Sequence, residues 1–279
     1  MNSRMLTAQN LVEFREYLLQ EEKSAATVEK YLRDARAFFV FAEEQLVTKE
    51  LTVAYKRSLE ERNYAIRSIN SMLASLNSLL DFLGWQDCKV KTLKCQREIY
   101  CSEEKELTKD EYMRLLTAAQ KQEQLWLVLQ TICSTGIRVS ELKYFTVEAM
   151  QLGEVSVRCK SKTRTILVPG RLKRMLLEFA NQKGITSGQI FVTRGGRPLD
   201  RSNIWAQMKK LCETADVNPA KVFPHNLRKL FARTFYGREK DIAKLADILG
   251  HGSIETTRIY IMSTGNEHRR KIEQLGLVI

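Results

Sequence analysis

Apolar and polar residues over positions 1–90 recur with the three-to-four-residue spacing of amphipathic α-helices. In each stretch the apolar positions fall on one helical face, and Thr27 stands where an N-cap would begin the second stretch. Four such helices can bury one small core, so we predict a helical domain over residues 1–90. The four stretches are residues 11–18, 28–42, 48–60 and 66–80.

Residues 86–105 lose the helical spacing. Up to position 97 the charged residues of this segment are all basic, apart from Asp87. This composition is typical of an exposed linker that could cross a phosphate backbone, and we place the domain boundary at residues 91–106. Thr108, followed by two acids, predicts the first N-cap of a second domain, residues 107–279. The basic residues of the predicted linker are Lys89, Lys91, Lys94 and Arg97.

The second domain mixes helical spacing with two β-prone runs, residues 155–158 and 165–168. The polar segment 159–164 between them is typical of a hairpin tip, and residues 190–193 could add a further strand. We therefore predict a mainly α protein with a small antiparallel β-sheet, built from an N-terminal helical domain and a C-terminal mixed α/β domain.

Composition excludes several classes of protein. No apolar run reaches the roughly 18 residues that a membrane-spanning helix needs, and the N-terminus lacks the apolar core of a signal peptide. The six cysteines show no Cys-x-x-Cys spacing, which favours reduced thiols over disulfides or a zinc site. We expect a cytoplasmic protein without a metal.

The net charge of +12 is concentrated in the second domain. Residues 1–100 hold 15 basic and 14 acidic residues, whereas residues 155–177 hold seven basic residues and no acid. Uncompensated basic charge favours a polyanion as partner, and nucleic acid suits it best because no amphipathic membrane anchor is evident.

Candidate phosphate-binding residues gather between positions 225 and 260. Pro224 predicts a helix start that places His225 and Arg228 on one face. Arginine offers phosphate oxygens a permanent bidentate charge, and histidine can move a proton near neutral pH.

The remainder of this stretch adds a histidine and a tyrosine. Gly250 predicts a helix end that leaves His251 in the following corner. Ser253 predicts the cap of a short helix carrying Tyr260, whose hydroxyl could form a covalent intermediate if neighbours assist it.

Further charged residues precede this stretch. Gly136 is predicted to break one helix, and the next places Arg138 and Glu141 on one face. Lys160 stands in the predicted hairpin tip, from which a lysine could reach into a cleft.

The pattern of these residues resembles the active site of the tyrosine recombinase (phage integrase) family of site-specific DNA recombinases. The segments TGIRVSEL, HNLR and LGHGS, the last followed by TTRIY, are similar to the sequence motifs typical of the family. By the same resemblance, residues 1–90 would be a core-binding domain that grips DNA and residues 107–279 the catalytic domain. The six positions that match in order are Arg138, Lys160, His225, Arg228, His251 and Tyr260.

The resemblance implies that Tyr260 attacks the scissile phosphate, leaving a 3′-phosphotyrosyl bond and a free 5′-hydroxyl. Arg138 and Arg228 would hold the non-bridging oxygens, and Lys160 would protonate the leaving oxygen. Lys162 remains an alternative to Lys160 as the general acid. The sequence holds neither a carboxylate cluster for two metal ions nor a glycine-rich phosphate loop, so we expect no cofactor.

The resemblance also implies supporting roles. His225 would assist proton movement at the nucleophile, His251 would hydrogen-bond the phosphate, and Glu141 would orient His225 or otherwise support the site. Predicted contacts to double-stranded DNA are Lys162, Arg164, Lys94 and Arg67.

The C-terminal residues 267–277 are predicted to form a terminal helix with apolar Ile272, Leu275 and Leu277. This helix resembles the segment that relatives dock into a neighbouring subunit, which implies homo-tetramers on paired DNA sites. The alternative is a helix that folds back on its own domain.

Three functions therefore remain open from the sequence. The favoured one is a strand-exchanging recombinase that acts in integration, excision or resolution. It would be either a mobile-element integrase or a Xer-like resolvase. A nicking and rejoining enzyme similar to type IB topoisomerases, and a DNA-binding protein with an idle site, are the alternatives.

Overall fold

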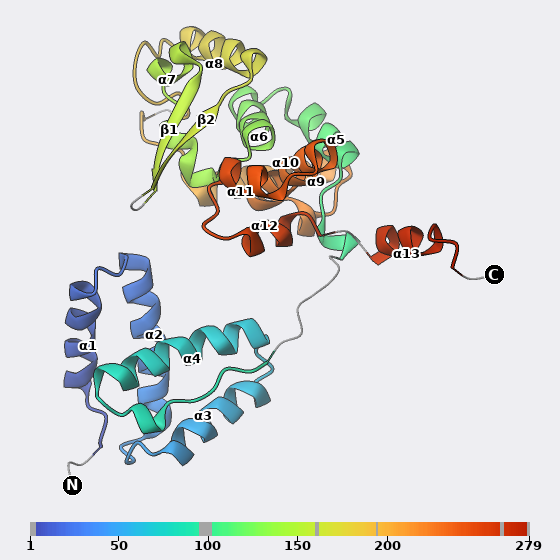
Figure 1. Ribbon diagram of the computed structural model, residues 1–279. Helices are drawn as coiled ribbons and strands as arrows, with labels where there is room; N and C mark the ends of the chain where they lie inside the picture. The colour runs from blue at the N-terminus through green and yellow to red at the C-terminus, as the bar shows by residue number, and fades with distance from the viewer. Residues whose placement is uncertain (1–3, 95–101, 160–161, 194, 263–264, 278–279) are drawn as a thin grey trace. The chain divides into compact units, whose positions relative to one another are not determined.

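The computed structural model describes residues 4–94, 102–159, 162–193, 195–262 and 265–277. The chain divides into two compact units, Met1–Arg97 and Glu98–Ile279 (Figure 1). Helices dominate both units, and the strands described form a single two-stranded antiparallel sheet, as the sequence predicts.

The N-terminal unit buries one core between four helices. Each helix contributes apolar side chains from one face, among them Phe14, Phe38, Leu59 and Leu73. The helices are α1 (Ala8–Gln20), α2 (Ala25–Ala42), α3 (Lys49–Glu61) and α4 (Ile66–Phe82).

The N-cap predicted for α2 is wrong by three residues. The hydroxyl of Ser24 accepts a hydrogen bond from the backbone N–H of Thr27, so Ser24 is the cap. Ala25 and Ala26, both favourable in helices, extend the first turn beyond the predicted start.

The prediction of an exposed linker beginning at residue 86 is also wrong. Gln86–Cys88 forms a 3₁₀ turn (η1) with Cys88 buried, and two asparagines of α4 bind the chain beyond it. The Asn77 side chain donates to the Val90 carbonyl at 2.9 Å and accepts from its N–H at 3.0 Å. Asn70 binds both backbone groups of Leu93 in the same way, at 2.9 and 2.7 Å.

The C-terminal unit is built around α6 (Glu123–Thr135), which is apolar on nearly every side. Its residues Leu127, Val128, Leu129 and Ile132 are at most 2% exposed, because helices from before and after it in the chain pack around it. Before α6 lie η2 (Glu103–Lys105) and α5 (Lys109–Ala119). The elements after it are η3 (Val139–Tyr144), α7 (Val147–Leu152), β1 (Glu154–Cys159), β2 (Lys162–Leu167), α8 (Gly170–Gln182), α9 (Arg201–Ala215), η4 (Pro219–Lys221), α10 (Pro224–Glu239), α11 (Ile242–Leu249), α12 (Ile254–Tyr260) and α13 (Gly265–Glu273).

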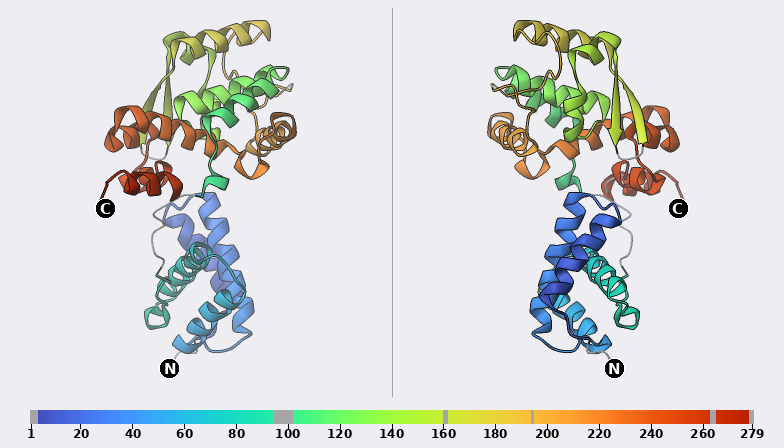
Figure 2. Two further views of the ribbon diagram at one scale, coloured as in Figure 1. Left: turned by 90° about the vertical axis from the view of Figure 1, so that its right-hand side faces the viewer. Right: turned by 90° about the vertical axis from the view of Figure 1, so that its left-hand side faces the viewer.

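The β1–β2 hairpin has a shorter tip than predicted. Its pairing extends from Glu154↔Leu167 to Cys159↔Lys162, so Arg164 lies within β2 opposite Val157. Arg164 is on the same face of the strand as the buried Ile166. Residues 190–193 do not join this sheet; Val192 instead forms an isolated bridge with Pro198. The three views place α8 at one end of this unit and α12 at the other (Figures 1 and 2).

No helix in the described part of the chain combines the length and apolar character needed to cross a membrane.

Candidate active site

The start of α10 places two of the predicted residues one helical turn apart. Pro224 occupies the first turn, where its missing N–H costs nothing, and the exposed His225 and the buried Arg228 follow. Arg228 is only 1% exposed and donates hydrogen bonds to the Gly136 carbonyl and, at 2.7 Å, to the Leu249 carbonyl. It therefore joins the ends of α6 and α11.

The end of α6 determines where the second arginine, Arg138, lies. Gly136 ends the helix with a φ of 65°, and a Cβ there would lie 2.3 Å from Cδ1 of Phe231 on α10. The chain then turns into η3, where the Arg138 N–H donates to Glu141 at 2.7 Å and its guanidinium does so at 3.1 Å. The carboxylate thus fixes both the backbone and the side chain of Arg138.

His251 follows the end of α11, where Gly250 has a φ of 65°. Its Nε2 lies 3.0 Å from Nη2 of Arg228, and its Nδ1 lies 2.8 Å from the hydroxyl of Thr257. Because an arginine can only donate, Nε2 must accept and the ring proton must sit on Nδ1, which donates to Thr257. Burial, Arg228 and Arg138 lower the pKa of His251 to about 4, so the ring is neutral at pH 7.

Tyr260 ends α12, a short helix that Ser253 caps as predicted. The residue is 8% exposed. Its ring centroid lies 5.0 Å from that of His225, 4.8 Å from that of His251 and 5.8 Å from the guanidinium carbon of Arg228. The ring of Tyr260 is therefore next to three of the predicted site residues, His225, Arg228 and His251.

The electrostatics of the site favour an anion. Burial, and next the charge of Arg138, lower the pKa of Arg228 to about 10. Partial burial, followed by Lys229 and Arg228, lowers the pKa of His225. The Nε of Arg228 is buried without a hydrogen-bond partner in the described residues.

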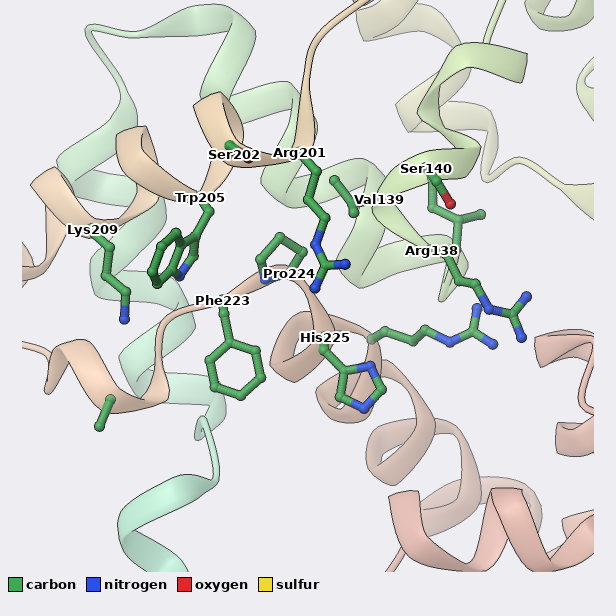
Figure 3. Close-up of a pocket in the computed structure, with 13 residues that line it drawn as sticks. Arg138, Val139, Ser140, Arg201, Ser202, Trp205, Lys209, Phe223, Pro224 and His225 are labelled. Carbon is green, nitrogen blue, oxygen red and sulfur yellow. The ribbon is translucent and has the colours of Figure 1, made fainter. Parts of the chain in front are cut away.

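A cleft of about 650 Å³ opens beside these residues. Figure 3 shows Arg201 of α9 extending toward His225 of α10, and Arg138, the residue before η3, also lines the cleft. Trp205 and Lys209 also line it, with the Lys209 ammonium 5.4 Å from the Trp205 ring centroid. This wall was not predicted from the sequence, although residues 201, 205 and 209 recur every four positions and so share one face of α9.

The other predicted residues are distributed as follows. Lys160 and the side chain of Lys162 lie outside the described residues, whereas Lys94 and Arg67 are exposed in the N-terminal unit. Arg164 does not suit its predicted role as a DNA contact, because its side chain is 15% exposed and binds Glu141 at 2.5 Å. The hydrogen bonds described for the Glu141 carboxylate go to Arg138 and Arg164, not to His225 as one prediction had it.

Sequence comparison relates both units to one group of proteins. The profile of the phage integrase family matches residues 105–267, and that of the phage integrase N-terminal SAM-like domain matches residues 11–87. Tyrosine recombinase XerA of Pyrococcus furiosus is 28% identical over 286 aligned positions, which cover 100% of this chain and 98% of the relative.

Solved structures share the fold. The XerH site-specific recombinase bound to its difH substrate superposes with a TM-score of 0.67 at 17% identity, covering 98% of this chain and 90% of XerH. A lambda integrase tetramer bound to a Holliday junction gives a TM-score of 0.74 at 18% identity, covering 93% of this chain and 78% of the integrase.

Proposed function

The chain belongs to the phage integrase family, and from this premise we propose that it is a site-specific tyrosine recombinase. It would cut and rejoin double-stranded DNA through a 3′-phosphotyrosyl intermediate on Tyr260. The observation that carries the proposal is the position of Tyr260, whose ring lies within 5.0 Å of both histidine rings and 5.8 Å from Arg228.

The chemistry follows from these neighbours. The Tyr260 oxygen forms the new bond to phosphorus while the bond from phosphorus to the 5′-oxygen breaks, so one ester replaces another and no ATP is needed. Arg138 and Arg228 stabilise the charge on the non-bridging oxygens, as fixed cations do in phosphoryl transfer.

The two histidines have different tasks. His225 takes the phenol proton, since its lowered pKa leaves the ring neutral and its ring adjoins that of Tyr260. His251 exchanges its contact with Arg228 for one with the phosphate, whose charge favours the protonated ring. A lysine of the hairpin, Lys160 or Lys162, protonates the leaving 5′-oxygen.

The test is a trapping experiment with nicked duplexes taken from the DNA that flanks the coding sequence of this chain. The nick lies in the cleaved strand, a few nucleotides 3′ of the scissile phosphate. Cleavage then releases a short fragment that carries the free 5′-hydroxyl, so rejoining fails and the adduct accumulates. We expect a band with the mass of protein plus DNA that retains a 5′ label, loses a 3′ label and is absent with Tyr260→Phe. An adduct that survives Tyr260→Phe, or one that retains the 3′ label, would overturn the proposal.

A finer proposal concerns assembly. In the described part of α13 and the residues after it, Ile272, Leu275 and Leu277 are 54%, 62% and 83% exposed, an apolar surface suited to burial against a neighbouring subunit. We propose that four copies assemble on two synapsed sites in the cytoplasm through this segment. Strand exchange between two labelled duplexes distinguishes this enzyme from a topoisomerase-like one, which would only relax supercoiled DNA.

A further inference from the structure

Arg164 occupies an unusual place for a basic residue of an exposed hairpin. It lies on the inner face of β2, and its guanidinium donates to two groups distant in sequence. One is the Glu141 carboxylate of η3, at 2.5 Å, and the other is the backbone carbonyl of Ile248 near the end of α11. Arg164 thus joins three elements that meet at the candidate active site.

The surroundings of Arg164 are shaped to receive it. A Cβ on Gly250 would lie 2.6 Å from Cδ of Arg164 and 3.0 Å from its Nε, so the glycine admits the arginine stem against the backbone. The side chain is 15% exposed, against 40% for Arg138. Arg164 is therefore the more enclosed of the two arginines that bind Glu141.

Two consecutive carbonyls at the end of α11 bind guanidinium groups. Ile248 accepts from Arg164, and Leu249 accepts from Arg228. Both arginines complement the negative end of the helix, and together they fix the backbone from which His251 follows.

Arg164 also acts on Arg138 through the carboxylate they share. The Glu141 side chain is 6% exposed. Its Oε1 accepts from the guanidinium of Arg138, and its Oε2 accepts from the guanidinium of Arg164 and from the backbone N–H of Arg138. Without Arg164 the carboxylate would lose one of its two cations, and the guanidinium of Arg138 would lose a fixed anchor.

We propose that Arg164 is a positioning residue that holds Arg138 and His251 in register for phosphoryl transfer and does not itself contact DNA. The proposal rests on the function proposed above. A displacement of about 1 Å at a reacting group can cost about a hundredfold in rate, so the effect belongs to the chemical step.

The test separates rate from affinity. Arg164→Met and Arg164→Lys are compared with wild type and with Arg238→Met, a control at an exposed arginine of α10. The rate of adduct formation is measured at saturating protein on the nicked duplex that traps wild type, and the dissociation constant by fluorescence anisotropy. We expect Arg164→Met to slow the bound-state reaction about a hundredfold with the dissociation constant changed less than about threefold. Arg164→Lys should lie between, because one ammonium cannot reproduce the planar fork.

A second variant guards against simple unfolding. Gly250→Asn keeps a residue that tolerates positive φ but adds the Cβ that collides with Arg164, so it should give the same loss of rate without loss of affinity. Weaker binding with an unchanged bound-state rate and a salt slope reduced by about one would make Arg164 a DNA contact. Rates that follow only the folded fraction, measured by circular dichroism, would also overturn the proposal. If wild type itself forms no adduct, the proposed function fails instead.

Discussion

The neutral state of His251 predicts a specific loss of stability in acid. Its pKa is lowered from 6.5 to about 4 by burial and by Arg228 and Arg138. The unfolded chain therefore takes up a proton below pH 6.5 that the folded protein does not accept until about pH 4. The contribution of His251 to stability is full above pH 6.5 and is lost progressively as the pH falls toward 4.

The magnitude follows from the proton affinity. At about 1.4 kcal/mol for each tenfold change, the loss by pH 5 is at most about 2 kcal/mol. The ring is partly solvent-accessible, which reduces the expected value to about 1 kcal/mol. For a unit of this size, that corresponds to roughly 2–4 °C in melting temperature.

Thermal melts at pH 7.5 and pH 5.0 measure this effect, with His251→Gln as the matched variant. Wild type should lose roughly 2–4 °C more than His251→Gln between the two pH values. His225 is present in both proteins, so the difference between them reports His251 together with its coupling to His225. Equal losses, or a His251 ring that titrates near pH 6.5 in an NMR experiment, would refute the hydrogen-bonded neutral ring.

Substitutions at Gly136, Glu141 and Arg201 test other contacts of the C-terminal unit. Gly136→Ala should lower the free energy of unfolding by about 2–4 kcal/mol in urea denaturation, because it adds a clash with Phe231 to the strain of positive φ. The control is Gly188→Ala, where φ is also positive but a Cβ meets nothing within 4 Å, so this variant should show the strain alone. Glu141→Gln should cost about 3 kcal/mol in the same assay, since two guanidinium groups lose a buried anion. Arg201→Met should weaken DNA binding and reduce the slope of log affinity against log salt by about one, whereas an unchanged slope would place Arg201 off the DNA.

Local signals in the sequence predicted the boundaries of the site well. Pro224 begins α10, Gly136 and Gly250 end α6 and α11 with positive φ, and Ser253 caps α12. Each of these depends on backbone geometry that a single residue type favours, so no knowledge of distant contacts was required.

Two of the errors arose where the deciding partner lies far along the chain. The half-buried Arg164 is held by Glu141 and Ile248, which are 23 and 84 residues away, and the hairpin sequence does not indicate either partner. The segment after residue 86 packs because side chains of Asn77 and Asn70 bind its backbone. Composition describes such a segment only as polar, whatever tertiary contacts it makes.

The most direct test of the account is to locate the covalent bond by mass spectrometry of the trapped adduct. After nuclease and trypsin digestion, the peptide 259–269 contains one tyrosine, and fragmentation separates it from Ser263 and Thr264. The account predicts a nucleotide linked through its 3′-phosphate to Tyr260. A nucleotide on any other side chain, or its attachment through a 5′-phosphate, would contradict it.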